Sequence, residues 1–210
     1  MNARPTPIVP HAGLVLLVGL LLLMPSAVAQ ESGSDSPVAY TDALHDAQRA
    51  HLWRVGAWGG ANALGGLALL LASKRSEQPG RFGAGVQLTA WGTINVGIAT
   101  LGLLSGGPDA ATTWAEALQS ENNYADILLL NLGLNVAYSA VGATLVAVSY
   151  RGVNSNLSVR GHGAALILQG LGLFILDGIA YLDTRGRWGA LAEQVALHVG
   201  PMGAQLTMAF

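Results

Sequence analysis

The sequence predicts an all-α membrane protein, a four-transmembrane-helix bundle followed by a short external C-terminal tail that resembles a β-hairpin. Three observations lead to this class: the composition, the lengths of the apolar segments and the charges of the segments between them. Of the 210 residues, 51% are hydrophobic and only 10% are charged, whereas soluble domains carry about a quarter of charged residues. The apolar residues are concentrated in runs near the twenty or so residues that a helix needs to cross a bilayer.

The composition also excludes several classes of function. The chain has no cysteine, which excludes disulfides, thiolate metal sites and a lipoprotein anchor. A net charge of -2 gives no reason to expect a nucleic-acid partner. The sequence contains no nucleophile–base constellation, phosphate-binding loop or specific metal motif, so we predict no catalytic residue, no metal and no cofactor.

The N-terminus has the three parts of a secretory signal peptide. Arg4 precedes an apolar core at 13–24, and small residues lead up to a cleavage site after Ala29. We therefore predict that residues 1–29 are a cleaved signal peptide. An uncleaved anchor is the alternative, and it would add a fifth helix. Residues 30–51 are then a periplasmic N-terminal segment, which ends in a helix from Tyr40.

Four apolar segments follow, and the charges between them predict their direction. The predicted spans are 52–73, 83–105, 126–149 and 161–182. Loops 74–81 and 150–160 carry basic residues, whereas loop 106–125 carries acids and no base. Because lysine and arginine collect on the cytoplasmic side, the basic loops should face the cytoplasm. We expect a bacterial inner-membrane protein with both termini periplasmic after signal cleavage.

Two segments outside the predicted spans, the loop before the third span and the C-terminal tail, have patterns that predict their structure. In the loop before the third span, a short interfacial helix should turn Trp114 and Leu118 to the membrane and leave Glu116 and Glu121 in water. The C-terminal tail, 183–210, is predicted to be periplasmic. Its end alternates apolar and polar residues around a Gly-Pro-Met-Gly turn, which is typical of a hairpin.

An internal duplication is a further hypothesis. Residues of the first and third spans match at an offset of 76, and residues of the second and fourth match at an offset of 78. The matched residues are Gly66, Leu69, Ser73 and Arg75 with Gly142, Leu145, Ser149 and Arg151, and Gly83, Gly85 and Gly92 with Gly161, Gly163 and Gly170. Two hairpins of the same orientation would form a parallel repeat.

Polar residues inside the spans give the candidate site. Asp177 is the one acid predicted within the hydrocarbon, where an ionisable group is costly and marks a functional hypothesis. Helical spacing places other polar side chains on faces that should meet it at the bundle centre. The candidate ligand- or ion-binding residues are Asp177, Asn131, Asn135, Tyr138, Gln169 and Asn95.

Two interpretations of these residues remain open. They can hydrogen-bond across helices and fix their register, or they can form a small cavity, open to the periplasm, that binds a cation, a proton or a polar ligand. An intramembrane enzyme is a weaker third possibility, because it would need a second catalytic group beside Asp177. A haem is excluded, since His51 and His162 lie at opposite ends of the spans.

The pattern Asn131-x-Gly133-Leu134-Asn135-x-x-Tyr138, continued by Gly142, Gly161-x-Gly163 and Gln169-Gly170 up to Asp177, resembles a family of small bacterial four-helix inner-membrane proteins of unknown function. The resemblance covers less than half of the chain. In that family an aspartate often stands at the position of Asn135. The resemblance implies a topology and no mechanism.

The predicted function is a structural, assembly or interaction role in the inner membrane. The alternative is a minor transporter or ligand-binding membrane protein that uses Asp177. The expected partners are the lipid bilayer and either a second copy of the chain or another membrane protein.

Overall fold

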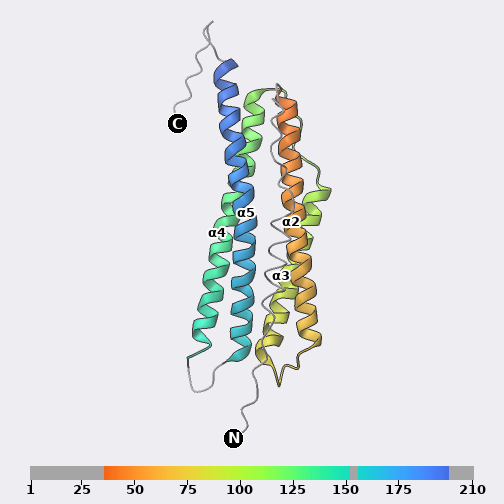
Figure 1. Ribbon diagram of the computed structural model, residues 1–210, viewed down its shortest axis with the longest axis vertical. Coiled ribbons are helices and arrows are strands. Elements are labelled where there is room, and N and C mark those ends of the chain that lie inside the picture. Colours follow the sequence, from red (N-terminus) through yellow and green to blue (C-terminus); the bar gives the residue numbers. More distant parts are fainter. Residues whose placement is uncertain (1–35, 152–155, 199–210) are drawn as a thin grey trace, which may run out of the picture.

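The computed structural model describes residues 36–151 and 156–198, and it describes side chains in the last helix as far as residue 192. These residues form four helices and no strand. The helices are α2 (Pro37–Leu71), α3 (Pro79–Leu104), α4 (Trp114–Val148) and α5 (Leu157–His198). They run in alternating directions along one long axis, so α2 and α4 descend while α3 and α5 ascend in Figure 1. The prediction of an all-α, four-helix protein is confirmed.

Local sequence explains where the helices begin. Ser36 caps α2 by accepting a bond from the Ala39 amide, and Pro37 takes the first position, where its missing N–H costs nothing. Thr113 and Glu116 form a reciprocal capping box at the start of α4. The backbone amide of Thr112 is the largest of the contacts that lower the pKa of the Glu116 carboxyl below its usual range.

The α3 helix ends early, and this shapes the end of the bundle at which α2 and α4 begin, which is called the outer end from here on. Its last residue is Leu104, and Gly106 then adopts a φ of 81°, a left-handed conformation that glycine tolerates best. With 26 residues, α3 is shorter than α2 and α4, which have 35 each, and α5, which has 42. At 1.5 Å per residue, the other helices therefore extend beyond α3.

Several predicted boundaries differ from the helices observed. The predicted helix from Tyr40 and the first span form one unbroken helix, because no proline interrupts them. The predicted interfacial helix is likewise the first part of α4. Beyond residue 182, α5 continues to His198. The first part of the predicted tail is therefore helical, including residues 195–198 of the expected hairpin, whose remainder at 199–210 lies outside the described residues.

The helices pack in two helical hairpins, α2 with α3 and α4 with α5. In each hairpin the two helices meet at glycines in equivalent positions. A Cβ atom added to Gly85 would lie 2.9 Å from the carbonyl oxygen of Gly66, and one added to Gly163 would lie 2.6 Å from that of Gly142. The same holds two turns away in each pair, at Gly92 and Gly170. Real Cβ atoms do not approach backbone this closely, so glycine is required at each crossing. The glycine contacts support the predicted duplication.

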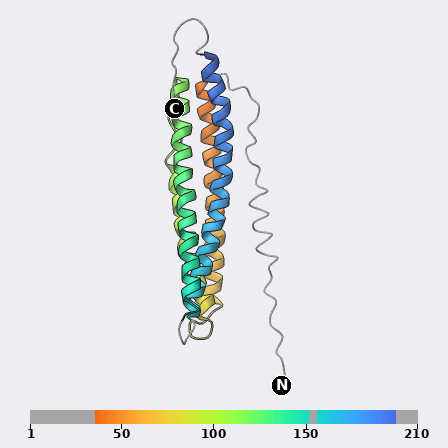
Figure 2. The ribbon, with the colours of Figure 1, turned by 90° about the vertical axis from the view of Figure 1, so that its left-hand side faces the viewer.

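The two hairpins meet where α3 crosses α5. A Cβ at Gly83 would lie 2.5 Å from the carbonyl oxygen of Ser158, and a Cβ at Gly161 would clash with the carbonyl oxygen of Gly80. The offset of 78 relates Gly83 to Gly161 and Gly80 to Ser158, so the contacts are reciprocal. Reciprocal contacts of this kind are the signature of a two-fold axis. The bundle is thus two similar helical hairpins packed against each other, and in Figure 2 the α4–α5 hairpin lies in front of the α2–α3 hairpin.

Polarity is inverted relative to a water-soluble bundle. Leu64, Leu101, Leu130 and Leu182, one from each helix, are between 64% and 70% exposed. The buried side chains include polar and charged groups from all four helices: His51, Arg54, Asn62, Asn95, Glu121, Asn135, Gln169, Asp177 and Thr184. Among the described residues, α4 and α5 are long and apolar enough to cross a membrane, whereas α2 and α3 do not meet that criterion. The four-span prediction is therefore supported for two helices.

The outer end of the bundle is more tightly packed than the sequence suggested. Trp114 and Leu118 do not turn outward but pack against a small core that includes Tyr40 and Leu191. The Tyr40 hydroxyl donates to the Arg187 carbonyl. Burial, followed by the nearby carboxylate of Glu121, raises the pKa of this hydroxyl, so it stays protonated as a donor.

Glu121 is fully buried, contrary to the prediction that it faces water. The Arg187 guanidinium donates to its carboxylate at 2.8 Å from Nη2 and 3.1 Å from Nε, and Nη2 also donates to Thr184 at 3.0 Å. A bidentate pair of this geometry offsets part of the cost of desolvating the two charges. The prediction was wrong because Glu121 lies on the inner face of a longer helix, in line with Ala117, Tyr124 and Leu128.

Candidate functional site

A cavity of about 380 Å³ lies between α3 and α4, in the half of the bundle near the α4 N-terminus. These two helices are the neighbours that do not approach, since no Cα of α3 is within 8 Å of a Cα of α4 in the described residues. The tilted stack of Trp91 on Tyr138, with ring centroids 4.9 Å apart, spans the gap at the inner end of the cavity. Toward the outer end α3 stops, and the space is bordered by Ser105 and Gly106.

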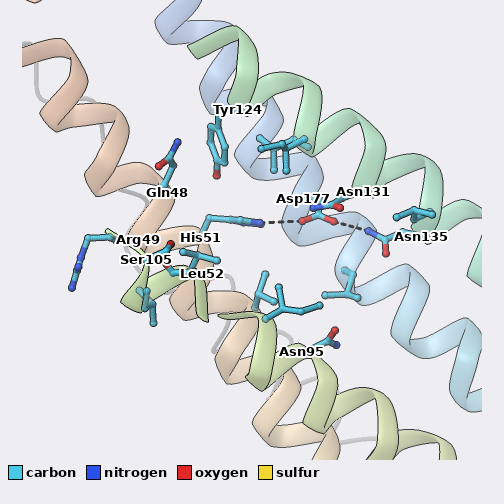
Figure 3. Close-up of a pocket in the computed structure, with 18 of the residues that line it drawn as sticks. Gln48, Arg49, His51, Leu52, Asn95, Ser105, Tyr124, Asn131, Asn135 and Asp177 are labelled. Atoms are coloured by element: carbon cyan, nitrogen blue, oxygen red, sulfur yellow. Dashed lines mark hydrogen bonds and ion pairs between the residues drawn. The ribbon is translucent and has the colours of Figure 1, made fainter. Parts of the chain in front are cut away.

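An acid, an imidazole and an amide from three helices form the polar centre of this cavity. Asp177 of α5 is 4% exposed, and its Oδ1 lies 3.0 Å from Nε2 of His51 on α2. Its Oδ2 accepts a bond of 2.6 Å from Nδ2 of Asn135 on α4. Figure 3 shows the three side chains in a row across the site.

The geometry assigns the tautomer of the histidine. Because Nε2 of His51 faces a carboxylate oxygen at hydrogen-bond distance, that nitrogen carries a proton. The ring's Nδ1 is buried and has no hydrogen-bond partner among the described residues. The Tyr124 hydroxyl, which points toward His51 from α4 in Figure 3, is also buried and without a partner there. Two polar atoms beside the acid are thus unsatisfied.

The predicted site residues fall into two groups. Asp177, Asn131, Asn135, Tyr138 and Asn95 all line the cavity. Their functional role stays a prediction, but their helical spacing and depth correctly indicated one region of the bundle.

Gln169 lies beneath the cavity and is not part of its wall. Its Oε1 accepts from Trp58 Nε1 at 3.1 Å and from Asn95 Nδ2 at 3.3 Å. Gln169 therefore supports Asn95, a wall residue, and joins α2, α3 and α5 below the site.

Sequence reasoning missed His51 and Tyr124. Both lie at the edge of a predicted span, where a polar group needs no explanation, so neither stood out. The available signal was depth: His51 near the start of the first span and Asp177 near the end of the fourth lie at the same level in an antiparallel bundle. No group of three or more potential metal ligands occurs in the described residues.

Comparison with models of protein families gives a match over more than half of the chain. The model of DUF6992, a family of unknown function, matches residues 54–178. This segment begins just after His51 and ends just after Asp177, so it contains the cavity walls contributed by α3, α4 and α5. No curated protein and no solved structure matches the chain.

Proposed function

The chain belongs to DUF6992, a family of unknown function, and we propose that it is a small integral membrane protein that binds a small ligand in the cavity between α3 and α4. The observation that carries the proposal is the pair of unsatisfied polar atoms, His51 Nδ1 and the Tyr124 hydroxyl, beside Asp177. An unmet buried polar atom costs about 1–3 kcal/mol. A ligand or water that enters the cavity can offset that cost.

A purely structural role explains less of the site. The bonds that Asp177 makes to His51 and Asn135 do fix α2, α4 and α5 relative to one another. However, a site built only for packing has no reason to keep a cavity of about 380 Å³ beside them. That volume is at the lower end of the range for small-molecule pockets, so the ligand is small.

All four helices are proposed to span the membrane, although only α4 and α5 pass on length and composition. The support is that α2 and α3 expose leucines such as Leu64 and Leu101 as fully as α4 and α5 do. In water such a surface would drive aggregation, whereas in lipid it is the expected exterior.

The proposed orientation follows from charge. The loops with Lys74, Arg75 and Arg151 lie at one end of the bundle, and the loop with Asp109 lies at the other. The basic end is therefore assigned to the cytoplasm of a bacterial inner membrane. The cavity then lies in the periplasmic half, and a cleaved signal peptide would supply the exported N-terminus.

Cysteine labelling tests the orientation, because the native chain has no cysteine. In intact spheroplasts, a membrane-impermeant maleimide should label Asp109→Cys and spare Lys74→Cys until the membrane is permeabilised. The reverse pattern would invert the topology, and equal labelling of both would contradict a membrane-spanning protein.

Modification of introduced cysteines also tests whether the cavity admits small molecules. Purified protein in mild detergent is treated with the neutral reagent 2-hydroxyethyl methanethiosulfonate. We expect fast modification of Asn131→Cys, whose side chain lines the cavity, and at least tenfold slower modification of Ala165→Cys, which is buried in α5 away from it. If Asn131→Cys is as protected as Ala165→Cys, the cavity does not admit small molecules and the proposed function fails.

A further inference from the structure

We propose that the ligand is an organic cation, an ammonium group attached to a small apolar body. This inference rests on the proposed function and names the chemical class that the cavity selects. Its basis is the combination of one buried carboxylate, three aromatic side chains and an aliphatic opening in the same wall.

The carboxylate of Asp177 is the first reason to expect a cationic ligand. Asp177 is the acid among the described residues that line the cavity, and its two observed partners there are the His51 imidazole and the Asn135 amide. The Asn135 amide carries no charge, and the His51 imidazole acts as a counter-ion only when it is protonated. A buried carboxylate in the wall attracts an incoming cation and repels an anion.

Two further basic side chains of the described wall lie at its rim. Arg49 lies at the outer rim, is exposed, and extends away from Asp177 in Figure 3. His45 also belongs to the outer end of α2, almost two turns before His51. Among the described residues of the wall, His51 is therefore the basic side chain in contact with the carboxylate.

The aromatic side chains are the second argument. Trp91 and Tyr138 close the inner end of the cavity, and Tyr124 forms part of its wall. An ammonium group within about 6 Å of an aromatic ring is attracted by the ring's quadrupole, and aromatic cages use this to bind quaternary ammonium ions. An anion would meet the same rings and the carboxylate with repulsion.

The aliphatic side chains at the opening of the cavity are the third reason, because they favour a ligand with an apolar body. Ile98 on α3 and Ile127 on α4 both line the cavity and are each 56% exposed, so aliphatic side chains flank the gap between the two helices. An apolar body attached to the cation is stabilised against these side chains. An inorganic cation would gain nothing from them, and among the described residues no cluster of three or more potential metal ligands accompanies Asp177.

Charge-selective modification of Asn131→Cys tests the inference. The rates with cationic 2-(trimethylammonio)ethyl methanethiosulfonate and anionic 2-sulfonatoethyl methanethiosulfonate are each divided by the rate of the same reagent with free 2-mercaptoethanol. We expect the cation to be favoured at least tenfold, which corresponds to about 1.4 kcal/mol. Asp177→Asn in the same background should reduce the ratio to near one. The control Asp126→Asn, which removes an exposed acid of α4 outside the cavity wall, should leave it unchanged.

A second measurement uses the intact carboxylate. Benzyltrimethylammonium should slow the modification of Asn131→Cys by the neutral reagent, whereas 3-phenylpropanoate at the same concentration should not. This comparison needs no Asp177 variant, so it decides the question even if Asp177→Asn does not fold.

The outcomes separate the two proposals. If Asn131→Cys reacts with the neutral reagent but shows no charge preference and no protection by benzyltrimethylammonium, the cavity is accessible and the organic-cation class is wrong. If a preference persists in Asp177→Asn, another group causes it and the assignment to Asp177 is wrong. If Asn131→Cys reacts with none of the reagents, the proposed function itself fails.

Discussion

The α2–α3 and α4–α5 hairpins share their packing but not their polar residues. Gly66 and Gly85 hold the first pair of helices together as Gly142 and Gly163 hold the second. The offsets of 76 and 78 that relate these glycines pair Asp177 with Ala99 (99 + 78 = 177) and therefore place an acid in one hairpin alone. The repeated residues build the scaffold, and the unrepeated ones build the site.

The two gaps between the hairpins differ in the same way. The cavity lies in the gap between α3 and α4, and the equivalent gap lies between α5 and α2. There the ring of Trp58 packs against Gly172 and donates to Gln169, and Trp58 is 3% exposed. An offset of 76 relates Trp58 to Leu134, which lines the cavity. A large ring fills one gap, and a leucine leaves the other open.

Of the two buried ion pairs, Glu121–Arg187 lies outside the cavity and should contribute more to stability than His51–Asp177. Arg187→Met leaves the fully buried carboxylate of Glu121 without its counter-ion, which typically costs about 3–5 kcal/mol. The double variant Glu121→Met/Arg187→Met removes both charges and should recover most of that loss. Urea unfolding in mild detergent, followed by circular dichroism, measures both. A double variant as unstable as the single would show that packing, not the unpaired charge, is responsible.

A repeated scaffold should respond equally at equivalent glycines. Gly161→Ala and Gly83→Ala each place a methyl group against backbone of the opposite helix, so α3 and α5 must separate. We expect each to lower the free energy of unfolding by about 1–3 kcal/mol, measured in the same way. Gly133→Ala is the matched control: a Cβ there meets nothing within 4 Å, and alanine favours a helix by up to about 1 kcal/mol. Markedly unequal losses at Gly161 and Gly83 would argue against the two-fold relation.

The sequence predicted the repeated part of the molecule well, because periodicity and glycine spacing are local properties. It also brought Asp177, Asn131 and Asn135 to one region, since each side chain's depth and helix face follow from counting along a span. It did not predict where helices end when no breaker is present. Glu121 was expected in water because it was assigned to a loop, yet α4 begins at Trp114 and carries it inside.

Which side chains contact each other across helices was less predictable than the position of each side chain along its own helix. His51 and Asp177 are 126 positions apart (177 - 51 = 126) and meet at 3.0 Å because the antiparallel hairpins bring the start of α2 beside the end of α5. The sequence gives the depth of each residue but not the rotation of one helix against another. For that reason the acid was identified and its imidazole partner was not.

The smallest effect on stability is expected at the cavity itself. Asp177→Asn keeps the shape of the side chain, and its amide oxygen can still accept from His51 Nε2. The new amide nitrogen would face the Asn135 nitrogen, which the Asn135 side chain can resolve by rotating its oxygen toward it. We expect a loss of about 1 kcal/mol or less in the free energy of unfolding. A loss as large as that of Arg187→Met would make Asp177 a structural residue like Glu121. The distinction between a scaffold pair and a binding pair, which supports the proposed function, would then not hold.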